Sequence, residues 1–256
     1  MLVAAAVCPS PPLLVPQVAT GAAPELDAAR AACADAVGLL AAARPDRLYV
    51  VGPAPEGAHG VYPAGTAGSF AGFGVDLSVH LGEGPAGDGS GHPADGRPAG
   101  GAEGRPAEGR PLPVSLSVAA WLLGRAGWAD APIEGLGVDE AATPDVCAGL
   151  GRGLADSAGR VALLVMGDGS ACRTVKAPGY LDERAAGFDA EAARALGTAD
   201  VTALLALEAE TAYELKVAGR APWQVLAGAA EGAGLDGRLL FEDAPYGVGY
   251  FVAAWS

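Results

Sequence analysis

The chain has 256 residues, of which 51% are hydrophobic and 18% are charged. This length and composition are typical of one large globular domain or two small ones and exclude a disordered chain. The formal net charge of −14 argues against a nucleic-acid-binding surface, because an acidic protein repels phosphate backbones. No apolar run reaches the ~20 residues that a membrane-spanning helix needs, and Met1 to Val7 lack the basic start of a signal peptide.

The cysteines are few and far apart. Cys8, Cys33, Cys147 and Cys172 form no CxxC pair. They are too few for a disulfide scaffold of this size, so they predict a reducing, cytoplasmic setting.

The first half of the chain alternates between strand and helix patterns. Residues 2–7 and 47–52 are short apolar runs, typical of buried strands. Between them, apolar residues recur at helical spacing over 24–43, which predicts a helix and therefore a parallel strand pair with a right-handed crossover. Strict alternation of apolar and other residues predicts a further strand at 73–81.

Residues 82–113 interrupt this order. They are almost entirely Gly, Pro, Ala, Asp, Glu and Arg, with Gly-Arg-Pro at 104–106 and 109–111. Such a composition cannot bury enough apolar surface to order itself, so it predicts a flexible insertion within a single domain over 1–256.

The second half again alternates. The patterns predict helices at 114–125, 143–156, 181–196, 199–217 and 222–231, and strands at 133–138, 160–166, 239–242 and 248–255. The expected fold is α/β, a three-layer α/β/α sandwich around a mostly parallel mixed sheet. Ligands of such folds bind beyond the carboxyl ends of the strands, which directs attention to the loops at 8–16, 53–72 and 167–180.

Common catalytic motifs are missing from these loops. Gly167-Asp-Gly-Ser170 follows a strand but lacks the third glycine of a dinucleotide-binding loop, and there is no Gly-Lys-Ser/Thr and no Gly-x-Ser-x-Gly. His59, His80 and His92 show no paired-ligand spacing. Only His59 lies in a loop of the expected cleft, so it is kept as a candidate.

Several fragments, in order, resemble one family. Cys8-Pro-Ser-Pro-Pro12 resembles the Pro-His-Pro-Pro signature of class III extradiol ring-cleavage dioxygenases, the protocatechuate 4,5-dioxygenase beta-subunit family and its Memo-like relatives. Leu48 to Pro53 resembles the strand before its Pro-His pair, and Leu163 to Ser170 the strand before its Ser-His pair. Pro245 to Tyr250 resembles its closing strand, so the resemblance extends over most of the chain.

The resemblance implies a ferrous ion held by two histidines and a carboxylate, with a further histidine as acid and base. In this chain Ser10 and Ala54 stand at the two ligand histidines, and Ala171 stands at the acid–base histidine. Near the expected carboxylate the chain reads Ala218 to Pro222, without an acid. Neither Ser nor Ala is a serviceable Fe(II) ligand, so we expect no metal and no cofactor.

The expected cleft has other reactive side chains. The thiols of Cys8 and Cys172 and the carboxylate of Asp168 are a donor set for zinc, and one of the thiols is a potential nucleophile. The favoured alternative is that the cysteines are packing residues and that Asp168 forms a turn. Arg173, Lys176 and Tyr180 are either anion contacts or ordinary surface residues. The candidate cleft residues are Cys8, Ser10, Pro53, Ala54, His59, Asp168, Ser170, Ala171 and Cys172.

Three functional interpretations follow. The first is a diverged, non-catalytic family member that binds a small molecule, or nothing, in the ancestral cleft. The second is an active metal- or thiol-dependent oxidoreductase that uses Cys8, Asp168 or Cys172 as substitutes. The third is a structural partner subunit, or a homo-oligomer, because the resembled family includes multi-subunit enzymes. Whether the chain is an enzyme is left open, and neither nucleic acid nor membrane is an expected partner.

Overall fold

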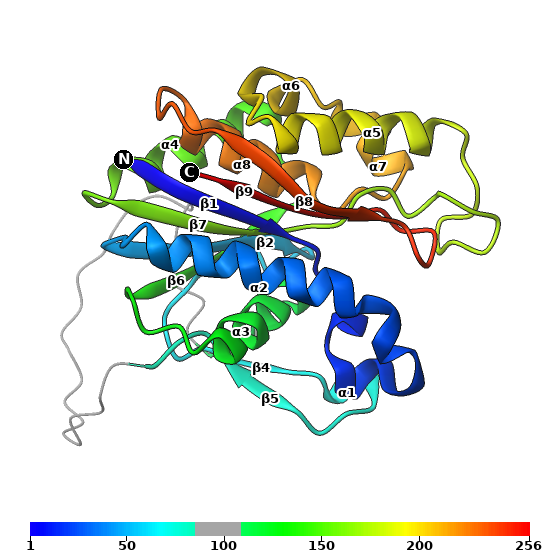
Figure 1. The fold of residues 1–256 in the computed structure, drawn as a ribbon, viewed down its shortest axis with the longest axis horizontal. Coiled ribbons are helices and arrows are strands. Elements are labelled where there is room, and N and C mark those ends of the chain that lie inside the picture. Colours follow the sequence, from blue (N-terminus) through cyan, green and yellow to red (C-terminus); the bar gives the residue numbers. More distant parts are fainter. Residues whose placement is uncertain (85–108) are drawn as a thin grey trace.

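The computed structural model describes residues 1–84 and 109–256. Its centre is a seven-stranded sheet in the order β3-β6-β2-β7-β1-β9-β8 (Figure 1). Four neighbouring strands are parallel: β6 (Ile133–Asp139), β2 (Arg47–Ala54), β7 (Val161–Met166) and β1 (Leu2–Cys8). The antiparallel strands are β3 (Gly60–Tyr62) at one edge, and β9 (Tyr250–Trp255) and β8 (Gly237–Asp243) at the other.

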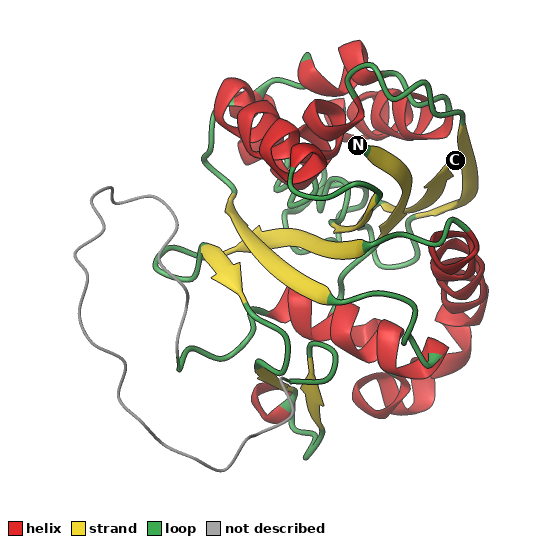
Figure 2. Cartoon of the chain, turned by 90° about the vertical axis from the view of Figure 1, so that its left-hand side faces the viewer, coloured by secondary structure: helices red, strands yellow, loops and turns green. Residues whose placement is uncertain are grey.

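Helices cover both faces of this sheet (Figures 1 and 2). One face packs against α2 (Asp27–Ala42) and α3 (Val114–Ala126). The other packs under α4 (Pro144–Asp156), α5 (Arg184–Gly197), α6 (Val201–Leu205), α7 (Ala209–Glu214) and α8 (Arg220–Ala230). The expected three-layer α/β/α sandwich is thereby confirmed.

Smaller elements complete the chain. Three are short 3₁₀ helices, Pro12–Leu14, Thr20–Leu26 and Ala71–Phe73, and α1 (Pro16–Ala19) is a single helical turn. Two strands, β4 (Ala67–Ser69) and β5 (Ser78–His80), form a separate hairpin sheet against α3 (Figure 1). None of the helices in the described residues is long and apolar enough to cross a membrane.

The apolar runs of the sequence became the central strands. Every residue of β7 is fully buried between β2 and β1. Successive residues of β1 alternate between the two cores: Leu2, Ala5 and Val7 face α5 and α8, whereas Ala4, Ala6 and Cys8 face α2 and α3. A strand covered on both faces needs apolar residues at every position, which is why its sequence shows no polar face.

Two predicted elements were wrong in extent. The strand predicted at 73–81 is reduced to Ser78–His80, because Ala71–Phe73 form a 3₁₀ turn that ends at Gly74 with φ +79°. The helix predicted at 199–217 is split into α6 and α7. The buried Gln224 amide donates to the carbonyls of Leu204, Leu205 and Leu207, and so satisfies the end of α6 in place of a continuing helix.

The expected insertion at 82–113 falls mostly on residues 85–108, outside the described residues. Its last residues belong to the folded domain. Leu112 is buried and its N–H donates to the carbonyl of Ala67, while Pro113 is the N-cap of α3. The predicted boundary at 113 was therefore too late by a few residues.

Candidate functional site

The loops predicted to carry function start from one edge of the sheet. Cys8 at the end of β1 pairs with Met166 at the end of β7, and Val51 of β2 pairs with Val165. The Gly167 N–H donates to the Cys8 carbonyl at 3.0 Å, which joins the first two loops. β1 runs from the labelled N-terminus toward this edge, which we call the carboxyl edge (Figure 1).

Asp168 is the ionisable group at the centre of the carboxyl edge. The backbone N–H of Ser10 donates to its Oδ1 at 2.7 Å. Burial of the carboxyl raises the pKa of Asp168 to about 7, although the hydrogen bond from Ser10 acts in the opposite direction. A carboxyl that gains and loses its proton near neutral pH is suited to hydrogen bonding in either state and to proton transfer.

Two tyrosines of the chain's last segment lie in this region: Tyr250 is near Asp168, and Tyr246 is near Tyr250. Burial raises the pKa of the Tyr250 phenol, with the charges of Asp168 and Tyr246 adding to the effect. The Tyr246 hydroxyl is sealed from solvent and makes no hydrogen bond within the described residues, and its pKa is raised by burial and by the neighbouring Glu25. Sequence reasoning missed both as site residues. Tyr250 was detectable, because it begins a strand antiparallel to β1 and must therefore lie at the carboxyl edge.

Ser170 is held by a buried ion pair. Its N–H and its hydroxyl donate to the two oxygens of Asp189, at 2.7 and 2.8 Å, and Arg173 donates to the same carboxylate at 3.0 Å. Asp189 is completely buried in α5. Arg173 is thus committed to a structural contact, while Lys176 and Tyr180 are exposed to solvent, so the structure does not gather these three predicted anion contacts.

Close approach of other segments explains Gly167, directly after β7, and Gly249, directly before β9. A Cβ on Gly167 would lie 2.4 Å from the Gly219 Cα, and a Cβ on Gly249 would lie 2.5 Å from Asp189 Oδ2. The Gly219 N–H donates to the Asp168 carbonyl at 2.8 Å. Residues 218–220 therefore reach the carboxyl edge, and Arg220 is the charged residue among them.

The two candidate thiols are on opposite sides of the sheet. Cys8 packs in the α2–α3 core, where it raises the pKa of the neighbouring Cys33 thiol. Cys172 packs in the α5–α8 core, and its Sγ donates to the Leu215 carbonyl at 3.5 Å. Burial raises the pKa of Cys172, which keeps it a thiol rather than a thiolate. The two thiols and Asp168 do not form a common metal site.

The remaining predicted residues serve mainly as scaffold. The Pro53 carbonyl accepts from the Ser115 hydroxyl at 2.6 Å, and Ala54 is buried at the end of β2. The Ala171 N–H donates to the Leu215 carbonyl. His59 is exposed, and its carbonyl accepts from Arg110.

The residues present do not fit a ferrous ion. Across residues 1–84 and 109–256, no three side chains of His, Cys, Asp or Glu are grouped so that they could hold a metal ion. Asp168 accepts a hydrogen bond from the Ser10 N–H, and Ser10, Ala54 and Ala171 supply no imidazole to accompany it.

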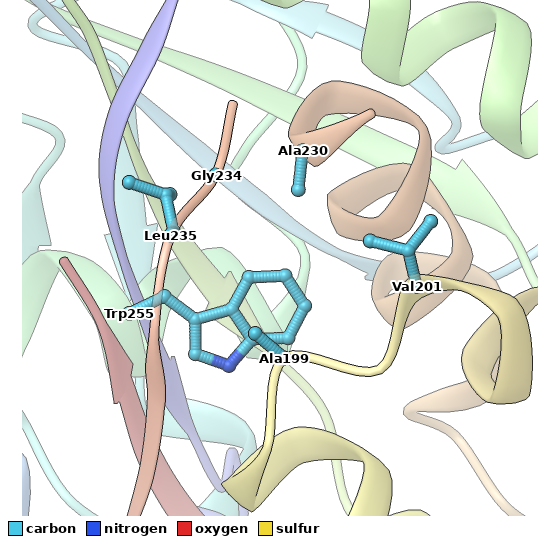
Figure 3. A pocket seen from close by; sticks show the side chains of 6 residues that line it. All are labelled: Ala199, Val201, Ala230, Gly234, Leu235 and Trp255. Atoms are coloured by element: carbon cyan, nitrogen blue, oxygen red, sulfur yellow. The ribbon is translucent and has the colours of Figure 1, made fainter. Parts of the chain in front are cut away.

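Two cavities lie outside the central part of the carboxyl edge. The larger, about 310 Å³, is lined by residues of the β6 end, α7 and the start of α8. The smaller, about 120 Å³, lies near the opposite end of the sheet, where Trp255 and its apolar neighbours enclose it (Figure 3). The Trp255 indole N–H is already bonded to the Leu196 carbonyl at 2.7 Å, so the small cavity offers little polar recognition.

Comparisons with known proteins establish the fold and nothing more specific. No protein-family model matches the chain, and no curated protein matches it. Among solved structures, the chain is similar to the crystal structure of the uncharacterized protein JW3007 from Escherichia coli K12. The identity is 16%, the match covers 99% of both chains, and the TM-score is 0.51.

Proposed function

We propose that this chain is a diverged relative of the class III extradiol dioxygenases that binds a small, uncharged organic molecule at the carboxyl edge and lacks the ring-cleaving iron site. The observation that carries the proposal is the Asp168 carboxyl, with a pKa of about 7, beside the Tyr250 phenol. Both lie where the loops after β1 and β7 meet.

The charges at this edge favour an uncharged ligand. Arg30 is paired with Asp27 at 2.6 Å, and Arg173 is paired with Asp189 at 3.0 Å. The carboxyl groups of Asp168 and Glu25 would repel an anion. A phenol or a related hydroxyl compound instead donates a charge-assisted hydrogen bond to ionised Asp168 and accepts one from Tyr250.

A second candidate function is proton-transfer catalysis at the same edge. The pKa of Asp168 favours it, since a general acid or base works best when its pKa is near the working pH. In this second function, Asp168 is the catalytic acid or base, and neither Cys8 nor Cys172 takes part in the reaction. The four free, buried cysteines are compatible with a cytoplasmic setting for either function.

Calorimetric titration with catechol, which is uncharged at neutral pH, tests the proposal. We expect one saturable site whose affinity rises as the pH rises through about 7, because ionised Asp168 is the stronger acceptor. Asp168→Asn should remove this pH dependence, and both Asp168→Asn and Tyr250→Phe should weaken binding about ten-fold, the usual loss for one good hydrogen bond.

Asp130→Asn is the matched control, since Asp130 is exposed in the loop that precedes β6, at the other edge of the sheet. Its affinity for catechol should equal that of the unaltered protein. Absence of saturable binding, or equal weakening in all three variants, contradicts a ligand site at Asp168. Turnover of a bound compound that is lost in Asp168→Asn selects the second candidate over the first.

A further inference from the structure

The larger cavity contains the most deeply buried arginine of the described residues. The cavity measures about 310 Å³, within the lower range of small-molecule sites. Arg220, the first residue of α8, is 2% exposed and contributes to the lining. Around it lie Glu140, Ala212, Tyr213, Glu214, Lys216 and Val217.

Arg220 has neutral partners only. Its Nη1 donates to the Ala142 carbonyl at 2.6 Å and to Gln224 Oε1 at 3.0 Å, and its Nη2 donates to the Glu140 carbonyl. These three bonds leave two of the five guanidinium N–H groups without a partner in the part of the chain that the structure describes. No carboxylate there forms an ion pair with it, so a nearly buried cation keeps an unneutralised charge.

The other charged groups around the cavity are one lysine and three carboxylates, of which one is paired. Lys216 is exposed at the rim and also has no ion-pair partner among the described residues. Glu214 is neutralised by Arg184 at 2.6 Å. Glu140 is the remaining carboxylate of the lining, and burial, together with Asp139, raises its pKa while Arg220 lowers it. Arg220 and Lys216 thus lack an ion-pair partner among the described residues, and the carboxylates of Glu140 and Asp139, which both act on Arg220, are also unpaired there.

We propose that this cavity binds the oxyanion group of a small metabolite, a carboxylate or a phosphate, between Arg220 and Lys216. The guanidinium supplies a fixed fork of donors from the buried end, and the lysine supplies a second charge from the rim. The exposed ring of Tyr213 offers an apolar surface for the rest of the ligand. This site lies toward the β6 end of the carboxyl edge, its lining does not include Asp168 or Tyr250, and it does not depend on the function proposed for those residues.

Titration calorimetry with inorganic phosphate and with sodium benzoate, as separate probes, tests the site and distinguishes the two oxyanions. We expect one site that saturates with at least one probe and binds more weakly as salt increases. Binding should strengthen as the pH falls and Glu140 is protonated, with Asp139 and Arg220 the charged groups that face it. Lys216→Gln should weaken binding about five-fold, and Arg220→Gln more than ten-fold.

The chain offers a matched control, because Lys176 is its other lysine and is also exposed. Lys176→Gln should bind both probes as the unaltered protein does. Lys216→Gln keeps the test valid if Arg220→Gln does not fold, since Lys216 lies at the surface. Absence of saturable binding by both probes, unchanged affinity in Lys216→Gln, or equal weakening in Lys176→Gln overturns the proposal. Lys216→Gln should still bind catechol normally, which separates this site from that of Asp168.

Discussion

Asp189 illustrates how one buried charge can hold a loop in place. It is fully buried, and its two oxygens accept from the Ser170 backbone, the Ser170 hydroxyl and Arg173. A carboxylate without these donors would be strongly unfavourable in the core. The loop after β7, which includes Asp168, is therefore fixed through α5, an element that follows it in the sequence.

Replacing Asp189 should show that the loop after β7 depends on this carboxylate. Asp189→Ala removes the acceptor for three donors and leaves the Ser170 groups buried and unpaired, so the free energy of unfolding should fall by about 3 kcal/mol. Urea denaturation followed by circular dichroism measures the change. Glu191→Ala on the same helix removes only an exposed pair with Arg194 and should change stability by less than about 1 kcal/mol. Similar losses in both variants would show that Asp189 has no special role.

At the scale of elements, α4 and α8 pack with their backbones in direct contact. A Cβ on Gly151 of α4 would lie 2.0 Å from the Val225 carbonyl oxygen, and one on Gly228 of α8 would lie 2.3 Å from the Ala148 carbonyl oxygen. Glycine is costly within a helix, and here it is required by the close approach. This packing positions α8, and with it Arg220 and the segment that contacts Asp168.

Gly151→Ala and Gly153→Ala form a matched pair on α4. The first substitution forces the helices apart and should lower the free energy of unfolding by about 3 kcal/mol, as overpacked cores do. The second meets nothing within 4 Å and should raise stability by about 0.5 to 1 kcal/mol, through helix propensity. Thermal unfolding of the two variants should therefore shift in opposite directions. If Gly151→Ala is as stable as Gly153→Ala, the helices are not in contact as described.

For the whole molecule, the sheet divides the core into two layers, and this division decides which side chains can meet. Cys8 ends β1 and Cys172 follows β7, and these strands end at the same edge, yet the two cysteines face different layers. Ser10 and Asp168 are 158 residues apart and are joined by a hydrogen bond. A site at the carboxyl edge therefore depends on sheet pairing across nearly the whole chain.

The proposed relationship to the extradiol dioxygenases leads to a prediction about iron binding by the whole protein. After anaerobic loading with Fe(II) and removal of excess metal, we expect far less than one iron per chain, because Ser10, Ala54 and Ala171 offer no imidazole. An oxygen electrode should record no consumption with protocatechuate. Elemental analysis checks the first expectation. Stoichiometric iron together with oxygen uptake would show that other residues rebuild the site.

The sequence by itself determined the layers and the edge. Apolar runs at 2–7, 47–52 and 160–166 are typical of strands buried on both faces, and the helical spacing after the first run predicts a parallel crossover, which brings the carboxyl ends of the strands to one edge. Local patterns also predicted the helix at 143–156, and the Thr143 hydroxyl caps it by accepting from the Val146 N–H. Such features depend on neighbours in the chain, which the sequence displays directly.

Only the tertiary structure decided which side chains from distant segments become neighbours. The raised pKa of Asp168, its proximity to Tyr250, the burial of Asp189 and the cavity around Arg220 all arise from contacts between distant segments. Local sequence does not specify such contacts, because desolvation and charge depend on whatever the fold brings near. The pattern of residues could therefore locate the edge of the sheet, but the protonation and pairing of its side chains followed only from the packed molecule.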